Sequence, residues 1–241
     1  MPKGRKARRY EGKQQDKQQE KFRDAVVVKA MTPGQREYII AIKNSQITIC
    51  TGPAGSGKTA IAVGLALQHV LAPSPTYEKL VIMRPAKEAC GESIGYLPGE
   101  LREKMSPWAA PVVDNMRVFV DNAQIKNLFW SGLADVVPLA FARGRSLNKS
   151  FIILDEAQSC TKEQVLMALT RIGAGSKMVV NGDLLQSDLA GRNGLSDAVD
   201  RLRGLESVSI VRMGDQDIVR NPIISLILQR YAGDYEPPPS P

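Results

Sequence analysis

The segment Gly52-Pro53-Ala54-Gly55-Ser56-Gly57-Lys58-Thr59 fits the pattern G-x-x-x-x-G-K-[ST] of phosphate-binding loops. Residues 47–50 before it form an apolar run, and residues 58–71 after it repeat apolar side chains with helical periodicity. Glycines allow backbone conformations that turn successive N–H groups toward an anion, and the start of a helix adds its positive dipole end. We therefore expect a strand, a loop whose residues bind nucleotide phosphates together with Ala60, and a helix. A purely structural glycine turn is the alternative, and the flanking strand and helix argue against it.

The rest of the chain continues this alternation of short apolar runs and helical patterns. Strands are expected at residues 80–83, 151–154, 178–180 and 208–211, and helices at residues 33–43, 161–171 and 221–231, with residues 100–143 mainly helical. Short buried strands that alternate with helices are typical of a parallel sheet covered on both faces. The pattern predicts an α/β fold of the P-loop NTPase kind.

Composition and charge set the boundaries of the folded part. Residues 1–24 carry nine Lys or Arg and four Asp or Glu, so they supply five of the chain's seven net positive charges. With almost nothing to bury, this arm is expected to be disordered. It is either a nucleic-acid-binding arm or a solvated tail. We expect one domain over residues 25–232 and a disordered, proline-rich tail over residues 233–241.

Several classes of protein are disfavoured by the same reading. No apolar run approaches the length of about 18 residues that a membrane helix needs, and the basic N-terminus has no apolar segment behind it. The cysteines Cys50, Cys90 and Cys160 are too scattered for a disulfide framework or a zinc site. These features favour a cytoplasmic protein without a membrane partner.

A second stretch, residues 151–156 (FIILDE), is an apolar strand that ends in two acids. The carboxyl ends of strands are where ligands of α/β sheets gather. Lys58 is expected to reach the β- and γ-phosphates, and Thr59 to ligate Mg²⁺ directly, with Asp155 holding it through water. Glu156 is expected to act as general base on the attacking water. Two adjacent acids also occur as a plain helix cap, which is the alternative.

A third stretch, residues 178–183 (MVVNGD), brings Asp183 and then Gln186 to what should be the same edge of the sheet. A side-chain amide can contact both a phosphate and a water molecule. Gln186 is therefore a candidate sensor of the γ-phosphate.

Taken together, these motifs resemble the PhoH family of P-loop ATPases, which is related to the first superfamily of helicases. The resemblance covers roughly residues 30–231. Besides the stretches above, it rests on Thr32-Pro33-Gly34-Gln35 with Tyr38, Arg84-Pro85-Ala86, Gly91-Glu92, Gly95-Tyr96-Leu97-Pro98-Gly99, Ala142-Arg143-Gly144-Arg145, Ala157-Gln158, Leu169-Thr170-Arg171-Ile172-Gly173 and Asp217-Ile218-Val219-Arg220. The chain departs from the family pattern at Cys90, an extra residue, at Asn221, where His is usual, and at the pair 184–185, where a proline is common.

The resemblance implies a RecA-like core that hydrolyses ATP and handles RNA or single-stranded nucleic acid. Gln35 would then read the adenine edge, and Gln158 and Arg171 would couple the ATP site to the nucleic acid. Arg220 resembles an arginine finger.

The length of the chain allows one such core only, so a finger would come from a neighbouring subunit. A homo-oligomer, a hexameric ring as the family suggests, would build such sites from Arg220, Arg143 or Arg145. Surface ion pairs are the alternative for these arginines.

Contacts to a nucleic acid are the least constrained expectation. Trp108, Trp130 and Phe141 are either stacking platforms or core residues. Arg84, Lys87 and residues 102–104 either line a path for a strand or form a solvated helix face.

Three functions remain open. The first is an ATPase that remodels or unwinds RNA. The second is a small-molecule phosphotransferase, against which the paired acids and the downstream Gly-Asp-x-x-Gln argue. The third is a nucleotide-dependent switch or binding protein without helicase activity, with or without an associated nuclease.

Overall fold

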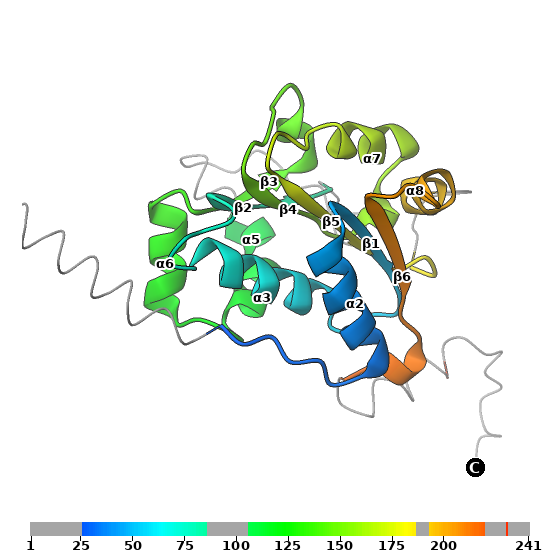
Figure 1. Ribbon diagram of the computed structural model, residues 1–241, viewed down its shortest axis with the longest axis horizontal. Coiled ribbons are helices and arrows are strands. Elements are labelled where there is room, and N and C mark those ends of the chain that lie inside the picture. Colours follow the sequence, from blue (N-terminus) through cyan, green and yellow to red (C-terminus); the bar gives the residue numbers. More distant parts are fainter. Residues whose placement is uncertain (1–25, 86–105, 187–192, 220–229, 231–241) are drawn as a thin grey trace, which may run out of the picture.

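A parallel β-sheet forms the centre of the molecule. The computed structural model describes residues 26–85, 106–186, 193–219 and 230. Within these residues the sheet has six strands in the order β3-β2-β4-β5-β1-β6, and every neighbouring pair is parallel (Figure 1). The strands are β1 (Ile47–Thr51), β2 (Lys79–Arg84), β3 (Ala134–Pro138), β4 (Ser150–Leu154), β5 (Lys177–Gly182) and β6 (Val208–Arg212).

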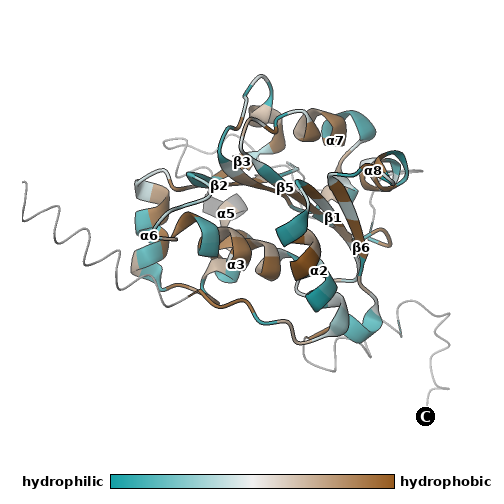
Figure 2. Cartoon of the chain, in the orientation of Figure 1, coloured by the Kyte–Doolittle hydropathy of each residue, from teal (hydrophilic) through white to brown (hydrophobic). Residues whose placement is uncertain are grey.

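Helices cover both faces of the sheet. One face carries α2 (Pro33–Asn44), α3 (Lys58–Val70), α5 (Ser106–Met116) and α6 (Asn122–Trp130), and the other carries α7 (Lys162–Leu169) and α8 (Gly194–Leu202) (Figure 1). Successive strand residues alternate between two apolar cores, so that Phe151 and Ile153 face α3 while Ile152 and Leu154 face α7 and α8. Burial on both faces explains why the inner strands consist mostly of apolar residues, and Figure 2 shows brown segments along the sheet.

Side-chain caps fix where several helices begin. The Thr32 hydroxyl accepts from Gln35 N at the start of α2, where Pro33 takes the first helical position. A capping box of Thr161 and Gln164 opens α7, and Asp121 forms another with the third residue of α6. Short 3₁₀ turns, η2 (Leu139–Ala142), η3 (Ala157–Ser159) and η4 (Asp215–Asp217), complete the described elements.

The prediction of an α/β fold with a covered parallel sheet is confirmed. One expectation was wrong, because residues 134–138, placed in a mainly helical region, form the edge strand β3 beside β2. Five residues, Ala134–Pro138 with Asp135 among them, are too few for periodicity to separate a strand from a helix segment. The expected arm, the proline-rich tail and the last helix at residues 221–231 lie outside the described residues, apart from Arg230. No helix in the described part of the chain is long and apolar enough to cross a membrane.

A close contact between α7 and α8 depends on a glycine. Gly194, the first residue of α8, donates its N–H to Cys160 O at 2.9 Å. A Cβ added to Gly194 would lie 2.3 Å from Thr161 O and 2.7 Å from Val165 Cγ2. Because Thr161 O is backbone at the start of α7, it cannot move aside as a flexible side chain would. The absence of a side chain at residue 194 therefore sets the distance between the two helices.

We predict that Gly194→Ala destabilises the fold, by about 2 kcal/mol, through overpacking between α7 and α8. Urea denaturation of the wild type and the variant measures the change in the free energy of unfolding. Ser196→Ala, on the same helix, is the control and should lie within about 0.5 kcal/mol of the wild type. A Gly194→Ala variant as stable as the control would contradict this account of the helix contact.

Candidate nucleotide site

The phosphate loop connects the carboxyl end of β1 to the start of α3. Gly55 and Gly57 have φ angles of 87° and 85°, in the left-handed region that glycine adopts without steric cost. Gly57 is also the N-cap of α3, so no side chain there competes for the first N–H groups of the helix. An uncapped helix start after a glycine loop is an arrangement suited to binding phosphate oxygens.

Lys58 lies across this loop. Its Nζ donates to Gly52 O at 2.7 Å and to Pro53 O at 2.8 Å. Burial lowers the pKa of Lys58, and the negative charges nearby, including those of the acids at the ends of β4 and β5, oppose that shift. The ammonium group thus lies within reach of an anion in the loop.

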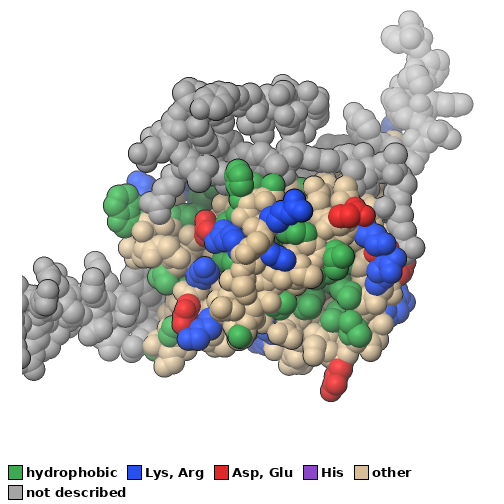
Figure 3. Space-filling view, turned by 90° about the horizontal axis from the view of Figure 1, so that it is seen from above, with side chains coloured by type: hydrophobic (Ala, Val, Ile, Leu, Met, Phe, Trp, Pro, Cys, Tyr) green, Lys and Arg blue, Asp and Glu red, His purple; other side chains and the backbone are tan. Residues whose placement is uncertain are grey.

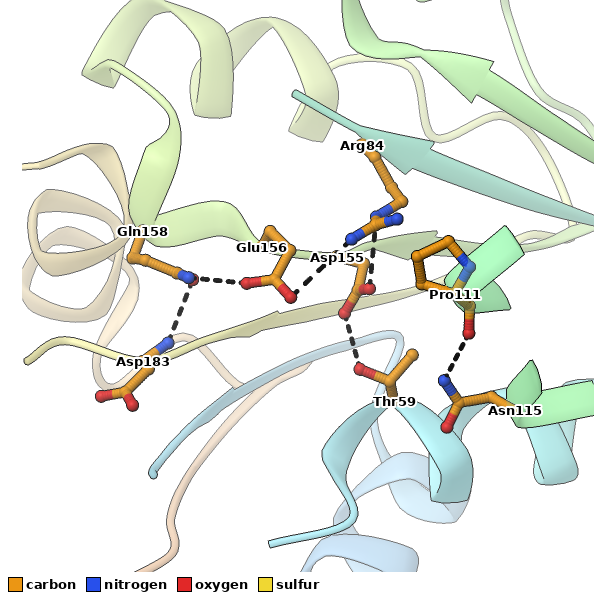
Figure 4. A network of polar contacts seen from close by, with 8 residues as sticks. All are labelled: Thr59, Arg84, Pro111, Asn115, Asp155, Glu156, Gln158 and Asp183. Carbon is orange, nitrogen blue, oxygen red and sulfur yellow. Dashed lines mark hydrogen bonds and ion pairs between the residues drawn. The ribbon is translucent and has the colours of Figure 1, made fainter. Parts of the chain in front are cut away.

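Asp155 follows β4 and is buried, with 4% of its surface exposed. Thr59 Oγ1 donates to Asp155 Oδ1 at 2.8 Å, and Arg84 Nε lies 3.6 Å from Asp155 Oδ2 (Figure 4). Burial raises the pKa of Asp155, Glu156 adds to the rise, and Arg84 and Thr59 oppose it. The oxygens of Thr59 and Asp155 are adjacent and are ligands of the kind that Mg²⁺ prefers, so the residues present fit this ion.

Glu156 has a strained backbone. Its φ and ψ angles are 58° and 39°, a left-handed conformation that costs a side-chain-bearing residue free energy. Its carboxylate is half-exposed and held on both sides: Gln158 Nε2 donates to Oε2 at 2.6 Å, and Arg84 Nη2 lies 3.8 Å from Oε1 (Figure 4). Strain at a residue whose carboxylate is fixed in this way points to a functional position.

Gln158 connects Glu156 to the end of β5. Its Oε1 accepts the N–H of Asp183 at 3.1 Å. The glycine before Asp183 makes room for this contact, because a Cβ at Gly182 would lie 2.7 Å from Gln158 Oε1 and 3.0 Å from Gln158 N. Gln186 is exposed beyond this turn, and no contact within the described residues brings its side chain to the two acids.

Gln35 packs against the phosphate loop from α2. Its Nε2 donates to Ser56 O at 3.1 Å, and its Oε1 accepts from Met31 N at 2.8 Å. The side chain is buried, so both amide atoms are engaged by the protein. The placement beside the loop agrees with a role near the nucleotide, while the adenine contact expected of Gln35 stays a prediction.

Asp217 belongs to the same cluster, and sequence reasoning gave it no role of its own. The side chain is fully buried and accepts hydrogen bonds from Thr32 Oγ1 at 2.5 Å, Gly34 N at 3.1 Å and Gly214 N at 3.0 Å. Two residues later, Val219 N donates to Gly55 O in the phosphate loop at 3.1 Å. Its only signal in the sequence was its place in the stretch 217–220, which does not reveal what it binds.

The other candidate residues lie apart from the acids or outside the described residues. Arg171 donates to Met167 O and Arg145 O, which holds the turn after α7, and Arg145 lies 3.7 Å from Asp135. Arg143 is exposed. Arg220, Lys87 and residues 102–104 fall outside the described residues, as does the side chain of Trp108.

Comparison with known proteins places this chain in a family. The family model described as PhoH-like protein matches residues 27–232. A PhoH-like protein of Synechocystis sp. is 41% identical over 224 residues, which are 92% of this chain and 67% of that protein. A PhoH-like protein of Bacillus subtilis is 40% identical over 206 residues, which are 85% of this chain and 64% of that protein. The chain thus spans about two thirds of the length of these relatives.

A solved structure shares the fold. The large terminase from a thermophilic bacteriophage superposes with a TM-score of 0.51 over 84% of this chain and 50% of that chain, at 12% sequence identity. Such a low identity bears on the fold alone, which is the RecA-like P-loop NTPase fold. With a family model that matches most of its length and relatives at about 40% identity, this chain belongs to the PhoH family.

Proposed function

We propose that this protein binds ATP with Mg²⁺, hydrolyses it, and couples hydrolysis to binding or unwinding of RNA or single-stranded nucleic acid. The observation that carries the ATPase part is the meeting of three segments at one edge of the sheet. Thr59 of the phosphate loop bonds Asp155 after β4. Glu156 beside it is bonded to Gln158, and Gln158 accepts the N–H of Asp183 after β5. This arrangement supplies the groups that phosphoryl transfer to water requires.

The roles of the residues follow from their positions. The loop N–H groups and Lys58 would bind the phosphates. Thr59 would hold Mg²⁺ directly and Asp155 through water, and the ion when bound neutralises phosphate charge. Glu156 would accept the proton of the attacking water at its half-exposed carboxylate. Gln158 would fix the direction of that carboxylate through its 2.6 Å hydrogen bond.

The nucleic-acid part of the proposal has different support. The arm at residues 1–24 supplies most of the net positive charge. The face shown in Figure 3 adds no such support, because basic and acidic side chains are mixed there and no continuous basic stripe runs across its described part. Trp130 and Phe141 are 81% and 61% exposed, as stacking platforms for bases would have to be.

The proposed assembly is a homo-oligomer, a hexameric ring, in the cytoplasm. A neighbouring subunit would supply an arginine to the γ-phosphate. Arg143 is exposed and could serve in this way, as could Arg145 or Arg220. A single subunit should then hydrolyse ATP slowly, since arginine fingers contribute roughly 10³–10⁵ in turnover.

A nucleotide-dependent switch without helicase activity is the second candidate. It is favoured by the contacts of the phosphate loop with distant segments, from Gln35 to Ser56 and from Val219 to Gly55. A change in the loop on nucleotide binding would reach α2 and η4 through these bonds.

We predict that Glu156→Gln strongly reduces hydrolysis and preserves binding, because the amide has nearly the same shape and cannot accept the proton. Phosphate release should fall by about 10²–10⁴, while the Kd for ATP stays within about twofold. Both are measured with and without single-stranded RNA and single-stranded DNA.

Stimulation of the wild type by one of the polymers, with Glu156→Gln silent, would support the coupled ATPase. Hydrolysis indifferent to either polymer would favour the switch. Undiminished hydrolysis by Glu156→Gln would remove Glu156 from the role of base.

We also predict that Gln158→Ala lowers kcat by about tenfold, because Glu156 loses a charge-assisted hydrogen bond and Asp183 N loses its acceptor. The KM for ATP should change little, since these two bonds hold the proposed base and the end of β5. Gln46→Ala, an exposed glutamine before β1, is the matched control. A higher KM with an unchanged kcat would mean that Gln158 acts on binding instead.

A further inference from the structure

Arg84 is the last residue of β2, and the sheet places it beside the acid pair. Met83 pairs with Leu154, and Asp155 N donates to Met83 O at 2.9 Å, which extends the ladder by one residue. The position of Arg84 is therefore set by backbone pairing between two central strands. The sequence left two expectations for Arg84, a path for a nucleic-acid strand or a solvated helix face, and the second is wrong because Arg84 ends a β-strand with its side chain 17% exposed.

The guanidinium group of Arg84 is shared between the two acids. Its Nε lies 3.6 Å from Asp155 Oδ2, and its Nη2 lies 3.8 Å from Glu156 Oε1 (Figure 4). Both distances are within ion-pair range and too long for good hydrogen bonds. The attraction is therefore mainly electrostatic, and the single positive charge of Arg84 interacts with two adjacent carboxylates.

Burial makes this charge effective. The Arg84 side chain is 17% exposed and that of Asp155 is 6% exposed, so solvent screens their attraction only in part. Two adjacent carboxylates repel each other and would also repel the phosphates of a nucleotide. A cation between them reduces both repulsions.

Each acid is also held from the side away from Arg84. Thr59 binds the other oxygen of Asp155, and Gln158 binds the other oxygen of Glu156. Arg84 thus completes a chain of contacts from Thr59 to Gln158, visible along the dashed lines of Figure 4. Removing it would take away the second contact that holds each carboxylate in its orientation.

We propose that Arg84 is a positioning residue for hydrolysis, which acts through Asp155 and Glu156 by placing one positive charge between them. This inference rests on the proposed ATPase function. It adds that Arg84 affects the rate of hydrolysis by orienting and neutralising Asp155 and Glu156. A lysine cannot replace it fully, because a single ammonium group does not present two nitrogens to two acids. The test separates charge, geometry and folding.

The experiment compares wild type, Arg84→Gln, Arg84→Lys and Arg201→Gln. Arg201 lies in an exposed ion pair with Asp197 on α8 and is the matched control for losing an arginine from an ion pair. Steady-state hydrolysis gives kcat and KM. Titration with a fluorescent ATP analogue gives Kd in Mg²⁺ and in EDTA, and thermal unfolding checks that each variant is folded.

For Arg84→Gln we expect kcat to fall about tenfold or more while Kd in Mg²⁺ stays within about twofold. The ratio of Kd in EDTA to Kd in Mg²⁺ should rise about threefold, because the acid pair then repels the metal-free nucleotide more strongly. Arg84→Lys should restore this ratio and only part of kcat. Arg201→Gln should match the wild type in all three quantities.

Three results would overturn the inference. Arg84→Gln could leave both kcat and the ratio unchanged, or raise Kd in Mg²⁺ as much as it lowers kcat, which would make Arg84 a nucleotide ligand. Arg84→Lys could be as impaired as Arg84→Gln in both quantities, which would point to packing alone. If Arg84→Gln does not fold, Arg84→Lys carries the test by the split between its ratio and its kcat.

Failure of the proposed function is recognised separately. A wild type that binds ATP and does not hydrolyse it would refute the ATPase activity, whereas the Kd ratio would still decide whether Arg84 neutralises the acid pair.

Discussion

The parallel alignment of β2, β4, β5 and β1 brings the phosphate loop, the two acids, Arg84 and Asp183 to the same end of the sheet. These four strands are neighbours in that order, and the functional residues lie at or directly after the carboxyl end of each strand. Arg84 is the last residue of β2, the two acids follow β4, Asp183 follows β5 and the phosphate loop follows β1. Residues about a hundred positions apart in sequence thus become contacts, as the 2.8 Å bond between Thr59 and Asp155 shows. A change of register in any of these strands would separate the groups.

Close packing of like charges is the cost of this arrangement. Asp155 is buried next to Glu156, and both effects raise its pKa. The hydroxyl of Thr59 and the guanidinium of Arg84 offset them from opposite sides. Backbone strain adds to the cost, since Glu156 has a left-handed conformation. Such features persist where the surrounding structure holds them, and here the surrounding structure is the pairing of two central strands.

Much of this could be read from the sequence, and the exceptions have physical causes. The glycine loop and the two acids after an apolar strand were recognisable because their chemistry demands fixed residue types at fixed spacing. The strand β3 was missed because five residues, one of them Asp135, carry no decisive periodicity. Arg84 was a candidate contact to nucleic acid and Asp217 was named within a longer stretch, yet the partners that they meet in the structure were not predictable. Which acid an arginine meets depends on strand order, and which donors surround a buried aspartate depends on how α2 and η4 pack. The site roles of Gln35 and Gln186 stay predictions.

The central claim is that the loop at residues 52–59 binds the phosphates of a nucleotide, and calorimetric titration tests it most directly. Wild type and Lys58→Ala are titrated with ATP and with AMP in Mg²⁺. We predict that the wild type binds ATP, that AMP binds far more weakly because it lacks the β- and γ-phosphates, and that Lys58→Ala weakens ATP binding by about tenfold or more. Equal affinity of the wild type for ATP and AMP, or ATP binding unaffected by the loss of Lys58, would contradict the account.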